Sequence, residues 1–339
     1  MRKKILITGC SGFIGFHLCK RLIEEEYNVL GIDNMNNYYD INLKKERLNL
    51  LLNNYPQGRF NFEEVNISSN ENLYNIFKSY KPELVINLAA QAGVRHSIEN
   101  PDTYLESNVF GFKNILECCK SFPVEKFIYA SSSSVYGGNK KVPFSEDDSV
   151  DHPVNLYAAT KKTNELLAHC YSHLYSIPSI GLRFFTVYGP WGRPDMAPML
   201  FANAILSRKP IKVNNNGRMY RDFTYIDDVI EFIMRILPKK ISPNKSFDRM
   251  NPTPSSSWAP HEIYNIGNSK PISLLEFISI IESNLNMKCI KEFAPMQKGE
   301  VKKTYANIDK IVNFTNYTPK TDLPEGISKF LKWFKEFYY

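Results

Sequence analysis

The sequence predicts an α/β protein with a doubly wound parallel sheet and a smaller C-terminal domain. Three observations carry this prediction. Short apolar runs alternate with helical patterns over the first 183 residues, a glycine-rich turn joins the first run to the first helix, and the alternation lapses after Arg183. At 339 residues the chain is also too long for one ordinary core, which favours two unequal domains.

Six runs of β-branched and apolar residues predict strands, at residues 5–8, 28–33, 60–65, 84–88, 127–131 and 179–183. Between them, apolar residues recur at three- and four-residue steps, which is typical of amphipathic helices, at residues 18–26, 73–80, 110–119 and 163–175. Ligands of doubly wound sheets bind at the carboxyl ends of the strands, so we expect the functional site there.

A glycine-rich turn, with glycines at positions 9, 12 and 15, lies between the first predicted strand and the first predicted helix. Glycine allows a tight turn and a close approach of backbone N–H groups to a pyrophosphate, whose charge then lies at the positive end of the helix. Asp33 closes the second strand 18 residues after Gly15, where a carboxylate can accept hydrogen bonds from ribose hydroxyls. Its charge, next to the neutral Asn34, predicts NAD rather than NADP.

These features predict a Rossmann-like NAD-binding domain at residues 1–185. Residues 186–339 would form mainly the substrate domain, with some segments returning to the first domain. Within them, residues 251–257 have the composition of a loop, and Ser273 with Glu276 predicts a capping box that opens a helix.

Composition excludes several classes of protein. No apolar run approaches the roughly 20 residues of a membrane span, and the apolar stretch after Lys4 breaks at Gly9, so we expect a cytoplasmic protein without a signal peptide. The net charge is +7, but the longest basic run has three residues, which favours a pocket for an anionic substrate over nucleic-acid binding. The six cysteines have no C-x-x-C spacing; we expect buried free thiols and no metal site.

Tyr157 and Lys161 stand four residues apart on one face of a predicted helix, 25 residues after a serine cluster at 131–134 that follows the fifth strand. Such a pair is a weak signal by itself, and Tyr74 with Lys78 forms a second one. The second pair precedes the fourth strand, whereas Tyr157 follows the fifth and the serine cluster. This context selects Tyr157 as the functional tyrosine.

The strand, serine cluster and Tyr-x-x-x-Lys pair together resemble the extended short-chain dehydrogenase/reductase family. The resemblance implies a catalytic triad of Ser132, Tyr157 and Lys161, with Tyr157 as the base. A phenol with a pKa near 10 is a poor base at neutral pH, so its phenolate needs stabilisation by the Lys161 ammonium and the nicotinamide charge. Ser132 would hydrogen-bond the same substrate hydroxyl.

Three further segments, at residues 87–95, 184–196 and 221–226, resemble those members of the family that act as UDP-glucuronate 4-epimerases. The resemblance implies a cytoplasmic homodimer that serves polysaccharide biosynthesis, in which helices near Phe110 and Thr163 form the subunit interface. It implies NAD contacts from Gly9, Gly12, Phe13, Ile14, Gly15, Asp33, Asn34, Asn66, Ile67, Leu88, Ala89, Ala90, Tyr157 and Lys161.

The same resemblance implies which residues hold a UDP-sugar. Arg221 would hold the diphosphate, Glu300 the uridine ribose, and Thr186 with Arg193 the sugar carboxylate. Arg95, Ser133 and Ser134 would also contact the substrate. Asn66 and Glu300 depart from the family, which usually has Asp at both positions, and this puts the nucleotide contacts in doubt.

The expected reaction is a reversible inversion at carbon 4 of UDP-glucuronate, through a 4-keto sugar, that yields UDP-galacturonate. A 4-epimerase of a neutral UDP-hexose or of a UDP-N-acetylhexosamine is the alternative. A 4,6-dehydratase is disfavoured because Ser133 and Ser134 stand where related dehydratases have an Asp-Glu pair. A non-catalytic NAD-binding regulator is disfavoured by the intact triad.

Overall fold

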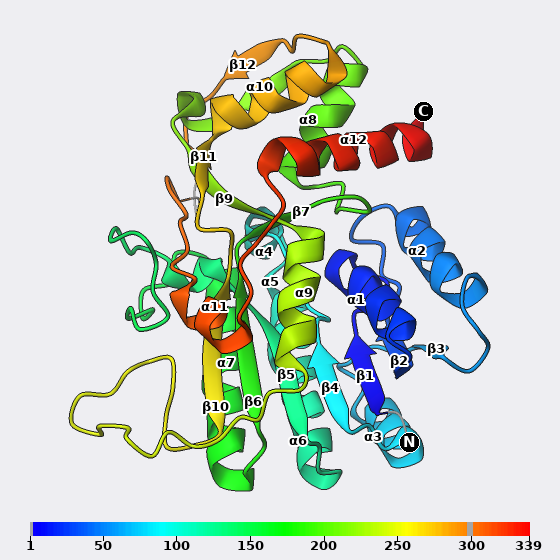
Figure 1. Ribbon diagram of the computed structural model, residues 1–339, viewed down its shortest axis with the longest axis vertical. Helices are drawn as coiled ribbons and strands as arrows, with labels where there is room; N and C mark the ends of the chain where they lie inside the picture. Colours follow the sequence, from blue (N-terminus) through cyan, green and yellow to red (C-terminus); the bar gives the residue numbers. More distant parts are fainter. Residues whose placement is uncertain (1–2, 297–300) are drawn as a thin grey trace.

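The computed structural model describes residues 3–296 and 301–339, and its largest feature is a seven-stranded parallel sheet (Figure 1). The strand order is β10-β6-β5-β4-β1-β2-β3, so the chain reverses its direction of progress between β1 and β4. This is the strand arrangement of a doubly wound sheet, and the predicted fold class is confirmed. The strands are β1 (Lys4–Thr8), β2 (Asn28–Asp33), β3 (Phe60–Glu64), β4 (Leu84–Asn87), β5 (Lys126–Ser132), β6 (Ser179–Phe184) and β10 (His261–Ile266).

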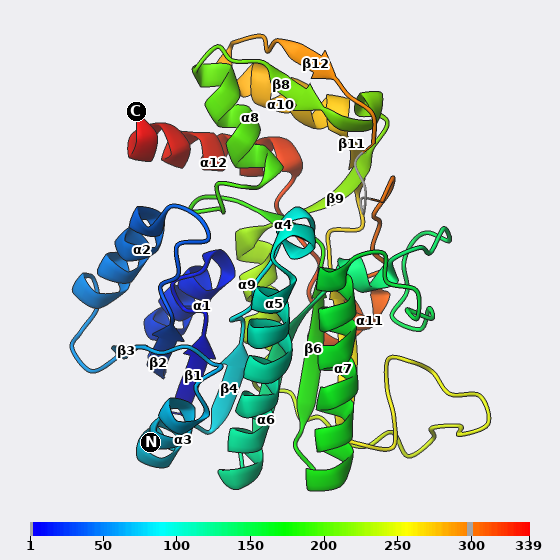
Figure 2. The same cartoon turned by 180° about the vertical axis from the view of Figure 1, so that it is seen from behind.

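Helices cover both faces of this sheet, as the two opposite views show (Figures 1 and 2). On one face lie α1 (Phe13–Glu24), α9 (Ile226–Ile236) and α11 (Asp309–Thr315). On the other lie α3 (Asn70–Tyr80), α6 (Phe112–Ser121), which continues the π-helical turn η1 (Leu105–Gly111), and α7 (Leu156–Tyr175). Successive strand residues point to opposite faces, so Ile5 and Ile7 join one core cluster while Leu6 joins the other.

A smaller lobe lies above the carboxyl ends of the strands (Figure 1). It contains a three-stranded sheet of β11 (Pro271–Ser273), β9 (Tyr220–Tyr225) and β7 (Thr186–Tyr188), and a two-stranded sheet of β12 (Lys291–Phe293) and β8 (Ile211–Val213). Its helices are α8 (Ala197–Leu206), α10 (Leu274–Leu285), α12 (Leu323–Tyr338) and the short η3 (Asn214–Gly217). The Ser273 hydroxyl accepts a hydrogen bond from the backbone N–H of Glu276, which confirms the predicted cap of α10.

The six strands and four helical segments expected from the sequence are all present, together with elements that the sequence analysis did not assign. Strand β10 comes from the C-terminal half of the chain and pairs with β6, so the large sheet has a seventh strand. Helix α2 (Ile41–Asn53) lies between β2 and β3. Two short helices, α4 (Val94–Glu99) and α5 (Pro101–Tyr104), and the 3-10 turn η2 (Ser133–Tyr136) follow strands β4 and β5.

Two expectations that came from composition can be compared with the structure. Among the described residues, no helix is both long and apolar enough to span a bilayer. All six cysteines are free, but the expectation that they are buried is wrong for Cys170, which is exposed on α7, and Cys289 is only half-buried. Cys170 lies on the side of α7 that faces away from the sheet. Sequence periodicity alone does not distinguish this side of the helix from the side that faces the core.

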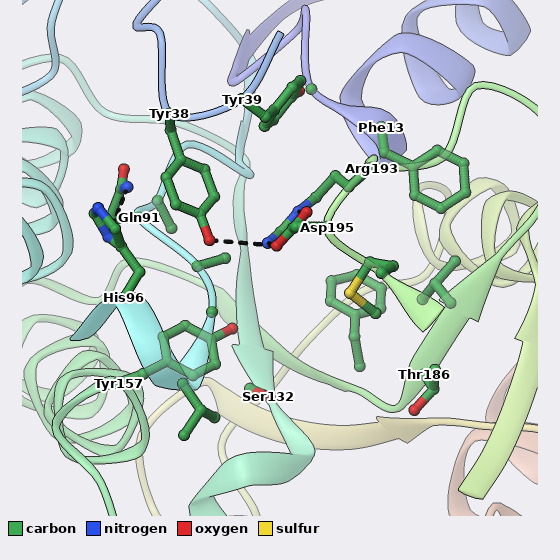
Figure 3. Close-up of a pocket in the computed structure, with 18 of the residues that line it drawn as sticks. Phe13, Tyr38, Tyr39, Gln91, His96, Ser132, Tyr157, Thr186, Arg193 and Asp195 are labelled. Carbon is green, nitrogen blue, oxygen red and sulfur yellow. Dashed lines mark hydrogen bonds and ion pairs between the residues drawn. The ribbon is translucent and has the colours of Figure 1, made fainter. Parts of the chain in front are cut away.

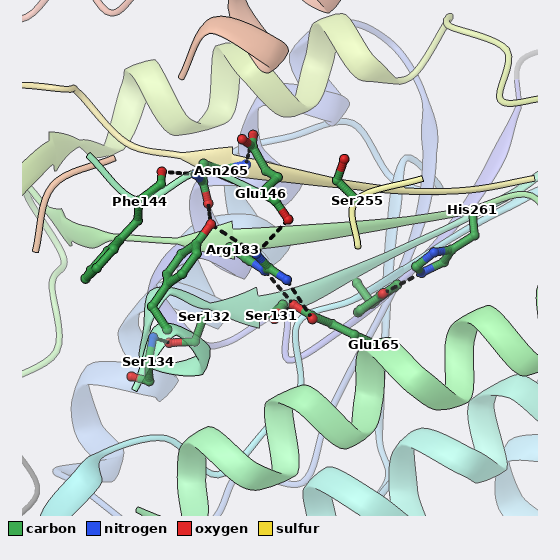
Figure 4. Close-up of polar contacts among 12 residues, drawn as sticks. Ser131, Ser132, Ser134, Phe144, Glu146, Glu165, Arg183, Ser255, His261 and Asn265 are labelled. Carbon is green, nitrogen blue, oxygen red and sulfur yellow. Dashed lines mark hydrogen bonds and ion pairs between the residues drawn. The ribbon is translucent and has the colours of Figure 1, made fainter. Parts of the chain in front are cut away.

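A buried ion pair fixes α7 against the sheet (Figure 4). The Arg183 guanidinium of β6 donates from Nε and Nη2 to the two carboxylate oxygens of Glu165 on α7, at 2.9 and 3.0 Å. Both side chains are almost fully buried, and Glu165 also accepts a 2.6 Å hydrogen bond from the Ser131 hydroxyl at the end of β5. Helix α7 is thereby tied to β5 and to β6, two of the strands on which it packs.

Replacement of one partner of this pair should destabilise the fold strongly. Glu165→Gln leaves the buried Arg183 guanidinium without its countercharge, and we expect a loss of about 3–5 kcal/mol in the free energy of unfolding, measured by urea denaturation. Glu25→Gln, which breaks the exposed pair of Arg21 with Glu25, is the matched control and should change stability little. Equal effects of the two substitutions would contradict a structural role for the buried pair.

Candidate active site

One cavity of about 1100 Å³ lies between the carboxyl ends of the large sheet and the smaller lobe. It brings together residues from the first strand to the C-terminal half of the chain. Of the residues that the sequence assigns to the site, Glu300 lies outside the described part of the chain. The others all line the cavity: Gly9, Gly12, Phe13, Ile14, Gly15, Asp33, Asn34, Asn66, Ile67, Leu88, Ala89, Ala90, Arg95, Ser132, Ser133, Ser134, Tyr157, Lys161, Thr186, Arg193 and Arg221.

The glycine turn is packed so closely that side chains do not fit. A Cβ on Gly15 would lie 2.1 Å from the Gly9 carbonyl oxygen, and one on Gly9, whose φ is +73°, would lie 2.7 Å from the Ala89 nitrogen. Helix α1 then begins after Gly12, which has no side chain to cap its first N–H groups. A backbone cradle at an uncapped helix N-terminus fits the pyrophosphate of a dinucleotide.

Asp33 lies at the end of β2 and its buried carboxylate is fixed by two backbone donors. Oδ2 accepts from the Ser11 N–H at 3.2 Å and Oδ1 from the Met35 N–H at 2.9 Å. The Lys44 ammonium of α2 lies 3.7 Å from Oδ1, an ion pair that sequence reasoning missed. Burial lowers the pKa of Lys44, and the Asp33 charge offsets part of that shift.

Asn66, Ile67 and the segment 88–90 form the cavity wall beside the glycine turn. The Asn66 amide donates to the Glu106 carboxylate at 3.3 Å, and its oxygen accepts from the Ser68 N–H at 3.1 Å. The Ala89 N–H donates to the Thr8 hydroxyl at 3.0 Å, which holds the end of β4 against β1. Asn66 is therefore a neutral, hydrogen-bonded part of this wall.

The proposed catalytic residues come from β5 and α7, which the hydrogen bond of the Ser131 hydroxyl to Glu165 joins (Figures 3 and 4). Ser132 is the last residue of β5, and its hydroxyl accepts from the Ser134 N–H at 3.1 Å. Tyr157 lies in the first turn of α7, which Asn155 caps through a 2.8 Å bond from the Ala158 N–H. One turn later, the Lys161 ammonium donates to the Ala130 carbonyl at 2.8 Å. Tyr74, the competing tyrosine, is half-exposed on α3 and is not among the residues that line the cavity.

Burial shifts the pKa values of both titratable members of the triad. It lowers the pKa of Lys161 to about 7, because a buried ammonium loses hydration. It raises the pKa of Tyr157, and the Ser132 hydroxyl and the Arg193 charge oppose that rise only in part. In the protein without ligands, Tyr157 therefore favours the neutral phenol, and a phenolate needs additional positive charge.

Arg193 is already engaged by a carboxylate of the chain itself. Its Nε and Nη2 donate to Asp195 at 3.0 and 2.5 Å, and the Tyr38 hydroxyl donates to the same carboxylate at 3.3 Å (Figure 3). The guanidinium also lies against the Tyr38 ring, 5.6 Å from its centroid. A second carboxylate would use the edge formed by Nη1 and Nη2 or displace Asp195. Sequence reasoning named Arg193 but missed Tyr38 and Asp195.

The remaining substrate residues lie on the smaller lobe and on the segments around it. Thr186 begins β7, and Arg221 lies on β9, where its Nη1 donates to the Tyr220 carbonyl at 2.9 Å. Arg95 lies on α4, and Ser133 and Ser134 form the start of η2. Lys209 and Lys212, near β8, also line this part of the cavity and add two ammonium groups that sequence reasoning missed.

The cavity is therefore a mainly cationic space that extends from a dinucleotide cradle to the smaller lobe, with the triad between them. Among the described residues, no group of three or more His, Cys, Asp or Glu side chains could hold a metal ion. The arrangement suits proton transfer by Tyr157 next to a bound dinucleotide and an anionic substrate.

Comparisons with known proteins agree with this geometry. A model of the NAD dependent epimerase/dehydratase family matches residues 5–267. Protein CapI of Staphylococcus aureus is 51% identical over 335 residues, which cover 99% of both chains. A probable UDP-glucuronate 4-epimerase of Rhizobium meliloti is 42% identical over 341 residues, which cover 99% of this chain and 98% of that one.

A solved structure is similar as well. The crystal structure of UDP-glucuronic acid 4-epimerase from Bacillus cereus, in complex with UDP-glucuronic acid and NAD, matches with a TM-score of 0.88 and 34% identity, over 99% of this chain and 100% of that one. The chain belongs to the NAD dependent epimerase/dehydratase family.

Proposed function

We propose that the protein is an NAD-dependent UDP-glucuronate 4-epimerase, which interconverts UDP-glucuronate and UDP-galacturonate. The observation that carries this proposal is the placement of Arg193 and Thr186 in the same cavity as Tyr157 and the glycine turn. A guanidinium fits a sugar carboxylate, and the phenol is available for proton transfer. The 42% identity to the Rhizobium meliloti protein over nearly the whole chain supports the same substrate.

The lining of the cavity supports a division of labour between the two parts of the chain. Residues 1–185 would hold NAD, with the pyrophosphate on the turn at Gly9 to Gly15 and the adenosine ribose on Asp33. Residues 186–339 would hold mainly the UDP-sugar, with Arg221 at the diphosphate and Lys209 and Lys212 nearby. The chemistry that NAD would supply when bound is reversible hydride transfer at carbon 4, from one face of the ring and back to the other.

The residues of the chain itself move one proton and hold the sugar. Tyr157 would take the proton of the 4-hydroxyl, Ser132 would hydrogen-bond that hydroxyl, and Lys161 would stabilise the phenolate. Since burial raises the pKa of Tyr157, this step needs the positive nicotinamide near the phenol, so proton removal would depend on the oxidised form of the cofactor. Return of the same proton completes the inversion, and no net redox change occurs.

The carboxylate must be held because oxidation at carbon 4 makes a β-keto acid, which readily loses carbon dioxide. Decarboxylation is easiest when the breaking bond stands perpendicular to the ketone plane. Arg193 would fix the carboxylate away from that geometry through two parallel hydrogen bonds, with help from the Thr186 hydroxyl. Asp195 holds the guanidinium at its Nε–Nη2 edge, which fixes the plane of the fork and supports such a clamp.

The alternatives are less well supported. A neutral UDP-hexose would leave Arg193 without an anionic partner other than Asp195. A dehydratase would need carboxyl groups next to Ser132, where η2 supplies the hydroxyls of Ser133 and Ser134. A non-catalytic regulator would not require the buried Lys161 beside the tyrosine.

We also propose a homodimer in the cytoplasm. Helices η1, α6 and α7 pack against one another (Figure 2), and large apolar side chains are exposed on two of them: Leu105 and Phe110 on η1, and Leu166, Leu174 and Tyr175 on α7. Exposed apolar side chains on two packed helices suit burial against a second copy of the chain. The six free cysteines suit a reducing compartment, where a product sugar nucleotide would be available for polysaccharide synthesis.

The first test concerns the base. Tyr157→Phe removes the only atom that takes the proton, and we expect turnover of UDP-glucuronate to fall at least about 100-fold while NAD remains bound. Tyr74→Phe, the control on α3, should leave turnover nearly unchanged. If both variants had the same activity, Tyr157 would not be the base.

The second test concerns the carboxylate. Arg193→Lys replaces a planar fork with a point charge, and we expect the specificity constant for UDP-glucuronate to fall about tenfold to hundredfold relative to that for UDP-glucose. This variant and Thr186→Ala should also release more UDP-pentose and carbon dioxide per epimerisation event. The control is Arg249→Lys, which lies outside the cavity. Unchanged preference and no additional carbon dioxide would favour a neutral UDP-hexose as the substrate.

The third test concerns the subunit interface. Leu166→Glu places a charge in the middle of the apolar surface of α7, and we expect it to convert the protein from dimer to monomer in analytical ultracentrifugation. Leu52→Glu, at a comparably exposed leucine of α2, is the control and should leave the mass unchanged. A wild-type protein that sediments as a monomer would refute the dimer.

A further inference from the structure

The loop between β7 and α8, which carries Arg193, is held from below by two side chains of the large domain. Arg47 of α2 donates from Nη2 to the carbonyls of Trp191 and Gly192, at 2.5 and 3.3 Å. His17 of α1 contacts the Pro190 carbonyl through Nε2 at 2.9 Å. Three consecutive carbonyls directly before Arg193 are thus bonded to α1 and α2.

The same Arg47 guanidinium also holds the glycine turn. Its Nη1 donates to the Ser11 carbonyl at 2.9 Å and to the Tyr39 hydroxyl at 2.7 Å. Ser11 lies between Gly9 and Gly12, and its N–H donates to Asp33. One side chain therefore bridges the turn that would cradle the NAD pyrophosphate and the loop that would position the sugar carboxylate.

The environment of Arg47 differs from that of a buried arginine whose task is only to stabilise the fold. Arg183, the other arginine that is fully buried among the described residues, is paired with the carboxylate of Glu165. Arg47 is also fully buried, but its four hydrogen bonds in the described structure go to neutral oxygens, and its Nε has no hydrogen-bond acceptor there. Burial of a charge without a countercharge is unfavourable, which indicates a task that the planar fork performs.

We propose that Arg47 is a positioning residue that couples the glycine turn to the loop of Arg193, so that the dinucleotide cradle and the carboxylate clamp keep one fixed separation. The proposal rests on the proposed function, because it takes Arg193 as the group that holds the sugar carboxylate. Arg47 touches neither reacting atom. Its effect is on where Arg193 sits, which matters only for a substrate with a carboxylate.

His17 provides an independent way to loosen the same loop. Burial lowers the pKa of His17 to about 3, so the ring is neutral over the working range. Because a carbonyl oxygen can only accept, Nε2 carries the proton and donates to Pro190. His17 does not contact the glycine turn through this bond, so its loss should affect the loop alone.

The experiment uses the NAD-loaded protein and the variants Arg47→Lys and His17→Phe, which keeps the ring but has no donor for Pro190, with Arg59→Lys as the control. Arg59 donates to a backbone carbonyl on the protein surface, away from both loops. Three quantities are measured for each: hydrogen–deuterium exchange of residues 189–196, the ratio of kcat/KM for UDP-glucuronate to that for UDP-glucose, and the carbon dioxide released per epimerisation event. Thermal unfolding shows that each variant is folded.

We expect Arg47→Lys and His17→Phe to speed exchange in residues 189–196, to lower the substrate ratio about tenfold and to raise carbon dioxide release, while Arg59→Lys changes none of these. Arg47→Lys should also weaken NAD binding severalfold, whereas His17→Phe should not. A merely structural Arg47 would lower turnover of both sugars equally and leave the ratio unchanged, and that result would overturn the proposal.

The outcome also separates this inference from the proposed function. If the wild-type protein showed no preference for UDP-glucuronate, the proposed substrate would be wrong, but faster exchange of residues 189–196 together with weaker NAD binding in Arg47→Lys would still support the coupling. If exchange in that segment were unchanged in both variants, the coupling would be wrong whatever the substrate. If Arg47→Lys did not fold, His17→Phe would decide the effect on the loop.

Discussion

The buried contact between Arg183 and Glu165 is the interaction on which the rest of the site depends. It links β6 to α7, and through Ser131 it also links both to the end of β5. The proposed triad is distributed over these same elements, with Ser132 adjoining Ser131 and Lys161 one helical turn before Glu165. A shift of α7 along the sheet would move the phenol and the ammonium away from the serine together.

The second constraint is the balance of charge within the cavity. Lys161, Arg193 and Arg221 bring positive charge to a partly buried space, and Asp195 and Asp33 compensate for only some of it. Such a space favours an anionic substrate. Burial causes both pKa shifts in the triad: the Lys161 ammonium loses hydration, which lowers its pKa, and burial penalises the Tyr157 phenolate, which raises the pKa of the phenol. Both shifts disfavour the charged forms that the proposed reaction uses, and a bound dinucleotide with its own charges would change both.

Much of the fold followed from the sequence because its physical causes are local. Apolar runs such as residues 5–8 and 84–88 are buried on both faces of the sheet and therefore read as strands. Helix α2 was missed because two of its four buried residues are Lys44 and Arg47, which break the apolar pattern. Strand β10 was missed because it follows a long irregular segment, and only the completed sheet shows that it pairs with β6.

The sequence predicted those site residues that belong to motifs of fixed spacing. It did not predict contacts between residues that are distant in the sequence. The glycine turn, Asp33 and the Tyr157–Lys161 pair have fixed spacings, and the structure brings all of them to the cavity. Tyr38, Lys44 and Asp195 lie in loops or in the unrecognised helix, and their partners are distant in sequence. Asp195 had one available signal, an opposite charge two residues after Arg193.

The position of β10 bears on the order in which the chain can fold during synthesis. Strand β6 ends at Phe184, but its outer neighbour spans His261–Ile266, so β6 remains an edge until about 80 further residues have been made. During that interval the backbone groups of an apolar strand, with Ile180 and Leu182 among its residues, lack their final partner. Helix α9, one of the helices that cover this sheet, is also synthesised after β6 and before β10. Completion of the nucleotide-binding sheet on the ribosome therefore awaits the C-terminal third of the polypeptide, and a chain truncated before residue 261 would have an unprotected edge prone to self-association.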